Sequence, residues 1–211
     1  MFVSCAVGIV LLFGIGKSSS QAADRSTGRA MPGDLVFKAS TSEQASALKE
    51  ATGSPYGHCG IIIDLHGTLH VAEAVNHVQV SNAVALGDWV QHRNGGVVVV
   101  KRWHGGLTPD QLSALRTAMQ AMQDWPYDVR FEPDHRMSYC SEFVYNSYAN
   151  AGIGKLGEWQ PFSSLHLDGR LVKELIRTRY TRQHPFDPSV KVITPVSVMN
   201  SGSLEQVTTL P

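Results

Sequence analysis

The sequence predicts an α+β domain, and three observations point to this class. Hydrophobic residues make up 43% of the chain and charged residues 17%, so the chain can bury a core of ordinary size. Its 211 residues correspond to one domain. A helical pattern comes early, a run of strand patterns follows, and further helical patterns come later. This order is typical of α+β folds.

The first half of the chain predicts a strand, a helix and a hairpin. The elements are, in order, a strand over 34–37, a helix over 41–52, a loop over 54–58, and strands over 59–64 and 69–75 around a turn at 66–67. Thr41 or Ser42 can cap the helix and Gly53 can end it. Three successive isoleucines mark the first hairpin strand as buried.

The second half of the chain predicts mainly helices. The elements are a strand over 97–101, a helix that begins after Thr108, helices over 141–151 and 171–177, and a strand over 191–193. Thr108 caps the first of these helices and Pro109 occupies its first position. Gly152 ends the helix that follows Cys140.

The N-terminal segment, residues 1–23, is expected to be a signal peptide or an N-terminal membrane anchor. Met1 to Gly16 carries no charged side chain, and small residues follow with a candidate cleavage site near Ala22. Sixteen apolar residues fall short of the roughly 20 that span a bilayer. We therefore expect an exported protein, periplasmic or secreted, with no membrane span in the mature chain. The alternative is an uncleaved inner-membrane anchor. The folded domain is expected over 30–211.

The composition argues against several classes of partner. Lys+Arg and Asp+Glu both number 18, so the net charge is zero and nothing predicts binding to nucleic acid. Three cysteines are too few for a disulfide scaffold, and there is no CxxC pair for a zinc site. No recognised metal-ligand spacing appears among the histidines, so we expect no metal and no cofactor.

Cys140 is the first candidate for chemistry. It lies where a loop meets the helix over 141–151, so the unpaired backbone N–H groups of the first helical turn surround it. These groups lower the pKa of a thiol and can hold an oxyanion during acyl transfer. The alternative is a small buried hydrophobe, which is what most free cysteines are.

The hairpin offers a second candidate pair, His58 and Glu73. Side chains alternate between the two faces of a strand, so an even number of loop residues places His58 and Glu73 on the same face. A Leu65-His66 loop sets them directly opposite each other, and a His66-Gly67 loop makes them diagonal neighbours. An odd loop separates them, so the spacing permits a carboxylate that orients an imidazole without requiring it.

Cys59 follows His58 and therefore points to the other face of its strand. We expect it to pack behind the sheet, away from the groups that His58 serves. The same alternation argues against an easy disulfide between Cys59 and Cys140.

Taken in order, these clusters resemble a known family. From about residue 32 to residue 196 the chain is similar to the YiiX/YebB-like proteins, the circularly permuted branch of the NlpC-type papain-like cysteine peptidases and amidases. The pieces that carry the resemblance are Gly33-Asp34-Leu35-Val36-Phe37, Tyr56-Gly57-His58-Cys59-Gly60-Ile61, Glu73-Ala74, Trp89, Val100-Lys101-Arg102, Pro126-Tyr127-Asp128, Phe131, Tyr139-Cys140-Ser141-Glu142 and Ile193-Thr194-Pro195.

The resemblance implies a circularly permuted papain-like fold, in which the nucleophile helix packs on a small antiparallel β-sheet. It assigns Cys140 as the nucleophile, His58 as the general base and then acid, and Glu73 as the polar third residue. Tyr56 and Tyr139 match positions near the pocket of the family and are candidates for substrate contact. The position after the histidine is usually aliphatic in the family, whereas this chain has cysteine there.

The function that follows is a thiol-dependent hydrolase of amide bonds that works through a thioester, with a peptide, amide or acyl substrate in a cleft. If the chain is exported, cell-envelope peptides are plausible substrates. Two alternatives stay open: an acyltransferase or lipid hydrolase with the same three residues, and a catalytically silent binding module of the cell envelope. A wide apolar cleft near Cys140 would favour the former, and a narrow polar cleft would favour peptides.

Overall fold

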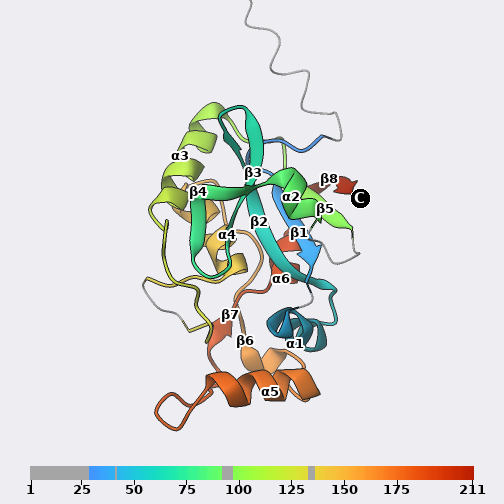
Figure 1. Cartoon of the computed structure of the whole chain (residues 1–211), viewed down its shortest axis with the longest axis vertical. Helices are drawn as coiled ribbons and strands as arrows, with labels where there is room; N and C mark the ends of the chain where they lie inside the picture. The colour runs from blue at the N-terminus through green and yellow to red at the C-terminus, as the bar shows by residue number, and fades with distance from the viewer. Residues whose placement is uncertain (1–28, 41, 92–96, 133–135) are drawn as a thin grey trace, which may run out of the picture.

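A six-stranded antiparallel sheet runs through the centre of the molecule (Figure 1). The computed structural model describes residues 29–40, 42–91, 97–132 and 136–211. The strands, in the order in which they lie side by side, are β4 (Val78–Ala85), β3 (Thr68–Ala74), β2 (Tyr56–Leu65), β1 (Leu35–Ala39), β5 (Val98–Trp103) and β8 (Leu204–Leu210). The antiparallel sheet with helices outside it confirms the expected α+β class.

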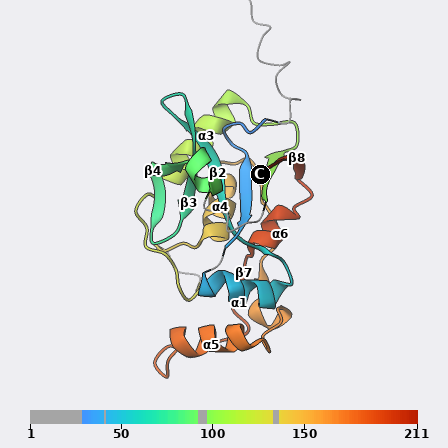
Figure 2. The ribbon, with the colours of Figure 1, turned by 45° about the vertical axis from the view of Figure 1, so that its right-hand side comes forward.

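Helices lie on both faces of the sheet and beyond one end of it. They are α1 (Glu43–Thr52), α2 (Leu86–Gln91), α3 (Pro109–Gln120), α4 (Cys140–Asn150), α5 (Arg170–Arg179) and α6 (Pro195–Met199). A 3-10 turn at Phe162–Ser164 and a small second sheet of β6 (Gln160–Pro161) and β7 (Lys191–Val192) complete the chain. In both ribbon views α1 lies between the end of the sheet and α5 (Figures 1 and 2).

The strands bury both faces of the sheet because successive side chains alternate between them. On one face Phe37 and Ile61 pack with Leu115 of α3 and Phe143 of α4. On the other face Val36 and Ile62 pack around Trp89 of α2. A smaller apolar cluster joins α1 to α5 through Ala47, Ala51 and Val172. The helix that carries Cys140 is thus held against the sheet by the main core.

Helix boundaries agree with the local signals in the sequence. Ser42 caps α1 by accepting a hydrogen bond from the backbone N–H of Ala45, whereas Thr41 lies outside the described residues. Gly53 ends α1 with a φ of 68°, a left-handed conformation that suits glycine. Thr108 and Gln111 form a reciprocal capping box at the start of α3.

The β2–β3 hairpin closes with a two-residue loop, which confirms one of the two even-loop alternatives. His66 and Gly67 both have positive φ, of 57° and 82°, and Leu65 pairs with Thr68. This is the backbone of a type I′ turn, whose twist matches the strands on either side. In this register His58 and Glu73 share a face and are diagonal neighbours.

Several elements differ from the sequence prediction. The expected loop over 54–58 is wrong in its second half, because β2 already begins at Tyr56 and pairs there with Ala39 of β1. The sequence did not predict four elements, the strands β4 and β8 and the helices α2 and α6. The helices have six and five residues, too few for a helical period to show, and the two strands lie at the edges of the sheet, where polar residues are common.

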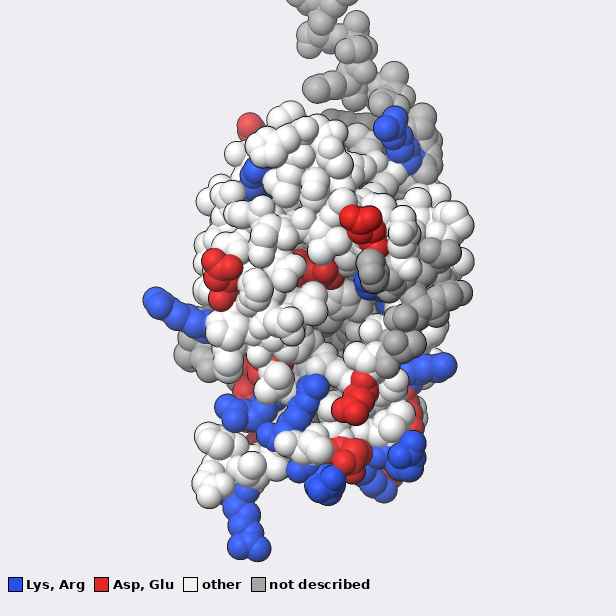
Figure 3. Space-filling model, viewed as in Figure 1, with Lys and Arg blue, Asp and Glu red and all other residues white. Residues whose placement is uncertain are grey.

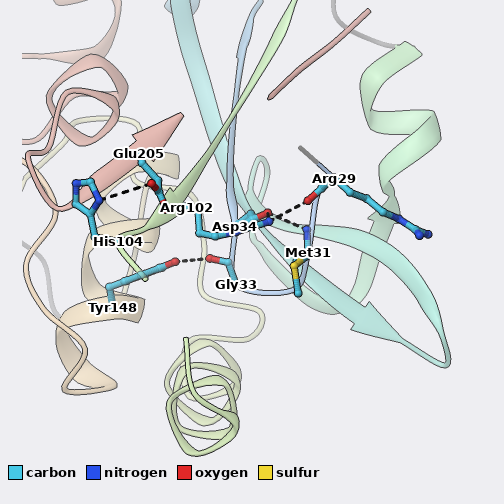
Figure 4. A network of polar contacts seen from close by, with 8 residues as sticks. All are labelled: Arg29, Met31, Gly33, Asp34, Arg102, His104, Tyr148 and Glu205. Carbon is cyan, nitrogen blue, oxygen red and sulfur yellow. Dashed lines mark hydrogen bonds and ion pairs between the residues drawn. The ribbon is translucent and has the colours of Figure 1, made fainter. Parts of the chain in front are cut away.

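A buried polar network ties the start of β1 to β5 and to α4 (Figure 4). The carboxylate of Asp34 accepts hydrogen bonds of 2.7 and 2.8 Å from the guanidinium of Arg102, and another of 2.8 Å from the backbone N–H of Met31. The hydroxyl of Tyr148, on α4, donates a hydrogen bond to the carbonyl of Gly33. The helix that begins with Cys140 is therefore anchored to the sheet by a polar contact as well as by packing.

No helix in the part of the chain that the structure describes is long and apolar enough to cross a membrane. The expected signal peptide or anchor over 1–23 lies outside the described residues.

Candidate active site

His58 and Glu73 meet across the hairpin. The Nε2 atom of His58 lies 2.5 Å from the Oε2 atom of Glu73. Both side chains are largely buried, with exposed fractions of 15% and 6%. Because Nε2 is occupied by the carboxylate, Nδ1 is the ring nitrogen left for another partner.

Glu73 is held by the helix α2 as well as by His58. Trp89 of α2 donates a hydrogen bond of 2.7 Å from Nε1 to the same Oε2 atom of Glu73. The ammonium of Lys38 lies 3.9 Å from the centre of the Trp89 ring and donates to the Trp89 carbonyl at 3.3 Å. Trp89, one of the residues that carried the family resemblance, thus fixes the carboxylate that orients His58.

Cys140 is the first residue of α4 and is 2% exposed. Tyr139, the N-cap residue, makes no side-chain hydrogen bond to the helix. Its side chain therefore leaves the backbone N–H groups of the first turn uncapped. The helix therefore presents its positive end at the sulfur, as the sequence predicted. His58 lowers the pKa of Cys140 and Cys140 raises the pKa of His58, so these side chains lie close together, and the structure brings Cys140, His58 and Glu73 into one site.

The three groups shift one another's pKa in the direction of an ion pair. Burial lowers the pKa of His58, but hydrogen bonds to Cys140 and Glu73 outweigh it and raise the pKa from 6.5 to about 10. Burial raises the pKa of Glu73, and its bonds to His58 and Trp89 reverse this, so the net shift is downward. The pKa of Cys140 is held well below its usual range, first by a hydrogen bond from the thiol of Cys59 and then by His58. The site favours a thiolate beside an imidazolium.

The position of Cys59 corrects the sequence prediction. Cys59 does point to the opposite face from His58, but it does not point away from the group that His58 serves. It is fully buried in the same core cluster as Cys140, and the charge of Cys140 raises the pKa of its thiol, so the two sulfurs lie near each other. The reason is that α4 packs on the face to which Cys59 points, and the β2–β3 ladder stops at the Ile61–Ala72 pair. His58 and Cys59, on opposite faces of β2, both lower the pKa of Cys140.

An open cleft and a narrow cavity lie on the two sides of this cluster. The cleft has a volume of about 570 Å³, and Lys38, Glu43 and Arg179 line it together with His58 and Glu73. On the face shown in Figure 3, charged side chains gather at the end of the molecule formed by α1 and α5, which borders this cleft. The cleft is therefore suited to a polar part of a substrate.

The narrow cavity lies beside Cys140 and is apolar. It has a volume of about 40 Å³, and its walls include Leu48, Phe131, Phe162 and Leu165. The same four residues also line a second cavity of about 60 Å³ that extends between α1 and α5. An apolar path thus leads from the sulfur towards α5.

The two tyrosines expected near the substrate have different surroundings. Tyr139 is buried, lines the narrow cavity, and accepts a hydrogen bond of 3.0 Å from the backbone N–H of Ile193. Tyr56 is half-buried at the start of β2 and packs against the main core. It lines neither the cleft nor the narrow cavity.

Sequence reasoning missed Gln44 and assigned no role to Tyr127. The side-chain amide of Gln44 donates a hydrogen bond of 2.5 Å to the hydroxyl of Tyr127. Burial and the charge of Cys140 raise the pKa of Tyr127 well above its usual value, so its hydroxyl keeps its proton. No local pattern marks Gln44, because it reaches the site only through the packing of α1. Tyr127 stands in the Pro126-Tyr127-Asp128 piece of the resemblance, which was the available signal.

The class of this protein follows from its similarity to known proteins. Residues 29–208 match a family described as permuted papain-like amidase enzymes, YaeF/YiiX, the C92 family. The chain belongs to this family, and its fold is the circularly permuted papain-like one that the sequence predicted. Membership supports the general assignment as a cysteine hydrolase.

Two relatives from Escherichia coli are similar over most of the chain. The uncharacterised protein YiiX of strain K12 is 31% identical over 175 residues, which cover 83% of this chain and 84% of that protein. The crystal structure of YiiX from strain O157:H7, also 31% identical, superposes with a TM-score of 0.76 and covers 86% of this chain and 96% of that one.

The YiiX protein of that crystal structure is described as a metalloprotein. Within residues 29–211 of the present chain, apart from the undescribed positions, no three His, Cys, Asp or Glu side chains come together in a way that could hold a metal ion.

Proposed function

We propose that this protein is a thiol-dependent hydrolase that cleaves amide bonds through a thioester on Cys140. The observation that carries the proposal is the chain of contacts from Glu73 through His58 to Cys140, in which the carboxylate occupies Nε2 at 2.5 Å and leaves Nδ1 for the sulfur. A nucleophile, a base and a group that orients the base form the arrangement that acyl transfer needs.

In the first step the Cys140 thiolate attacks the carbonyl carbon of the substrate. The backbone N–H groups at the start of α4 stabilise the oxyanion that forms. The hydroxyl of Tyr127 is a second donor, because the amide of Gln44 occupies its acceptor side and leaves its proton available. The imidazolium of His58 then gives a proton to the departing amine, and the thioester remains on Cys140.

In the second step His58, now neutral, takes a proton from water, and the hydroxide attacks the thioester. Glu73 keeps the imidazole in one tautomer and stabilises its charged form in both steps. The water and the amine reach His58 from the polar cleft, which opens on the side of the imidazole. In this arrangement the leaving group occupies the cleft and the acyl group occupies the narrow cavity.

The test is to incubate the full chain with fluorogenic amides of varied acyl group and to analyse the protein by mass spectrometry at early times. We expect turnover together with an adduct on Cys140 that hydroxylamine removes. Cys140→Ala and His58→Ala should both abolish turnover, whereas His70→Ala, a matched histidine control on β3, should not change it. Turnover that survives Cys140→Ala would refute the proposal, and a chain that forms no adduct on any substrate would favour a silent binding module.

A second candidate function is supported by the apolar path beside Cys140. The cavity next to the sulfur and the one between α1 and α5 share walls of Leu48, Phe131, Phe162 and Leu165, which suit a hydrocarbon chain better than a polar peptide. This favours an acyltransferase or lipid hydrolase with the same three residues. A rise in kcat/KM with acyl length from two to about ten carbons would support this function at about 0.8 kcal/mol per buried methylene. A preference for short peptide amides would contradict it.

Export of the protein is also a proposal, and it rests on the apolar segment over 1–23. If the segment is cleaved, the mature protein should begin near Ala23, which N-terminal sequencing of protein purified from the native cell would show. Cell-envelope peptides are then the amide substrates to test first.

A further inference from the structure

Two thiols lie in contact at the centre of the site, although the mechanism uses only one of them. The thiol and the backbone of Cys59 both lower the pKa of the Cys140 thiol, so Cys59 lies beside the Cys140 sulfur. Cys59 lies on β2 and Cys140 begins α4, and the two belong to one buried cluster. A disulfide between them requires the two sulfurs to approach to about 2.05 Å.

The two sulfurs differ in protonation, which gives each a distinct part in oxidation. Cys140 is the thiolate of the pair, and thiolates react with hydroperoxides. Burial and the neighbouring charge of Cys140 raise the pKa of Cys59 well above its usual value, so Cys59 stays a thiol in the reduced protein. Cys140 is therefore the sulfur that is oxidised first.

The cavity beside Cys140 can hold a small oxidant next to the sulfur. The sulfur is 2% exposed and lines a cavity of about 40 Å³. A space of this size holds a molecule such as water or hydrogen peroxide, because one water needs about 10–15 Å³ of such volume.

We propose that Cys59 is a resolving cysteine that converts oxidised Cys140 into a reversible Cys59–Cys140 disulfide. A hydroperoxide transfers one oxygen to the Cys140 thiolate, which gives the sulfenic acid and leaves hydroxide or alkoxide. The Cys59 sulfur then attacks the Cys140 sulfur, the S–O bond breaks, and water leaves with the proton of the Cys59 thiol. The two sulfurs are oxidised by two electrons in total, and the peroxide is reduced. The disulfide blocks the nucleophile and protects it from further oxidation until a dithiol reduces it.

The experiment treats the full chain, in a Cys5→Ser background, with hydrogen peroxide at neutral pH and follows the intact mass and the tryptic peptides. We expect a loss of about 2 Da, a peptide that joins Cys59 to Cys140, and full recovery of both thiols with dithiothreitol. In Cys59→Ser and Cys59→Ala, we expect a gain of about 32 Da on Cys140 that dithiothreitol does not reverse.

Three results would overturn the proposal. The first is sulfinic or sulfonic acid on Cys140 of the parent protein while Cys59 remains a free thiol. The second is equal reversibility of the oxidation in the parent and in both Cys59 variants. The third is oxidation of Cys59 in Cys140→Ser at the rate seen in the parent. Thermal unfolding shows whether the Cys59 variants are folded. Because both Cys59→Ser and Cys59→Ala are tested, the experiment still reads out if one of them does not fold.

Formation of the Cys59–Cys140 disulfide does not require turnover of an amide. Its readout is mass and thiol count, so a protein without any amidase activity can still form the disulfide. An active amidase can equally well fail to form it, which keeps the two failures distinguishable.

Discussion

The indole N–H of Trp89 donates to the Oε2 atom of Glu73 at 2.7 Å, and the same oxygen lies 2.5 Å from the imidazole of His58. One carboxylate oxygen thus joins α2 to the histidine. Trp89 is 1% exposed, so water does not replace its hydrogen bond. The side chain acts on His58 through Glu73 and is a positioning residue.

Trp89→Phe should weaken catalysis by loosening Glu73. A hydrogen bond to a charged group contributes about 1.5–3 kcal/mol, which corresponds to a reduction in kcat/KM of about 10-fold or more. The pKa of His58, followed by NMR of the imidazole, should change as well, and a purely structural role for Trp89 would leave it unchanged. An unaltered His58 pKa in a folded variant would contradict the assignment.

Glu73→Gln should lower the pKa of His58. The negative carboxylate stabilises the imidazolium and contributes to the rise from 6.5 to about 10, so its loss must move the pKa downward. The charged imidazole stabilises the fold fully below pH 6.5 and loses this contribution as the pH rises through about 10. NMR titration of His58 in the parent and in the variant measures the shift, with Glu174→Gln on the exposed face of α5 as the control. A higher or equal pKa in Glu73→Gln would refute this interpretation.

Gly60→Ala should destabilise the hairpin that carries the histidine. A Cβ at this position would lie 2.5 Å from Cγ1 of Val71 and 2.8 Å from the carbonyl oxygen of Ala72, so β3 would have to move. Overpacking of this kind costs about 1–3 kcal/mol. Chemical denaturation should show the loss, whereas Gly67→Asn, at the open turn of the same hairpin, should cost less. A Gly60→Ala variant as stable as the parent would show that the contact is not tight.

Asp34→Asn should be among the most damaging substitutions away from the site. Asp34 is 1% exposed and accepts two hydrogen bonds from Arg102, so the variant removes the negative charge that is hydrogen-bonded to a buried guanidinium. Breaking a buried pair on one side costs about 3–5 kcal/mol. The free energy of unfolding measures this, with Asp168→Asn, whose ion pair with Lys173 is exposed, as the control. Equal losses in the two variants would contradict the role of the network.

Local signals in the sequence predicted the parts of the site that depend on neighbours along the chain. The turn at His66-Gly67 set the face that Glu73 shares with His58, and the position of Cys140 before a helix set its electrostatics. The family resemblance supplied the roles of these residues. The helices α1 and α3 followed from their capping residues.

The other parts of the site depend on packing between segments far apart in the chain, which local signals do not predict. Alternation along β2 correctly separated Cys59 from His58, but it could not show that α4 would lie on the face of Cys59. Gln44 reaches the site only because α1 packs beside the end of β2, where Gly57 leaves room for Ala45. The apolar path likewise arises between helices that no local pattern brings together.

The central claim is that His58 and Cys140 form an imidazolium–thiolate pair, and the pH dependence of alkylation by iodoacetamide tests it most directly. The lowered pKa of Cys140 predicts that its alkylation rate in the parent stays near its maximum as the pH falls from 9 to about 6, and that His58→Ala moves the midpoint up towards the ordinary thiol value of about 8.5. Peptide mapping separates Cys140 from the other thiols. A parent midpoint near that ordinary value, unchanged in His58→Ala, would contradict the account.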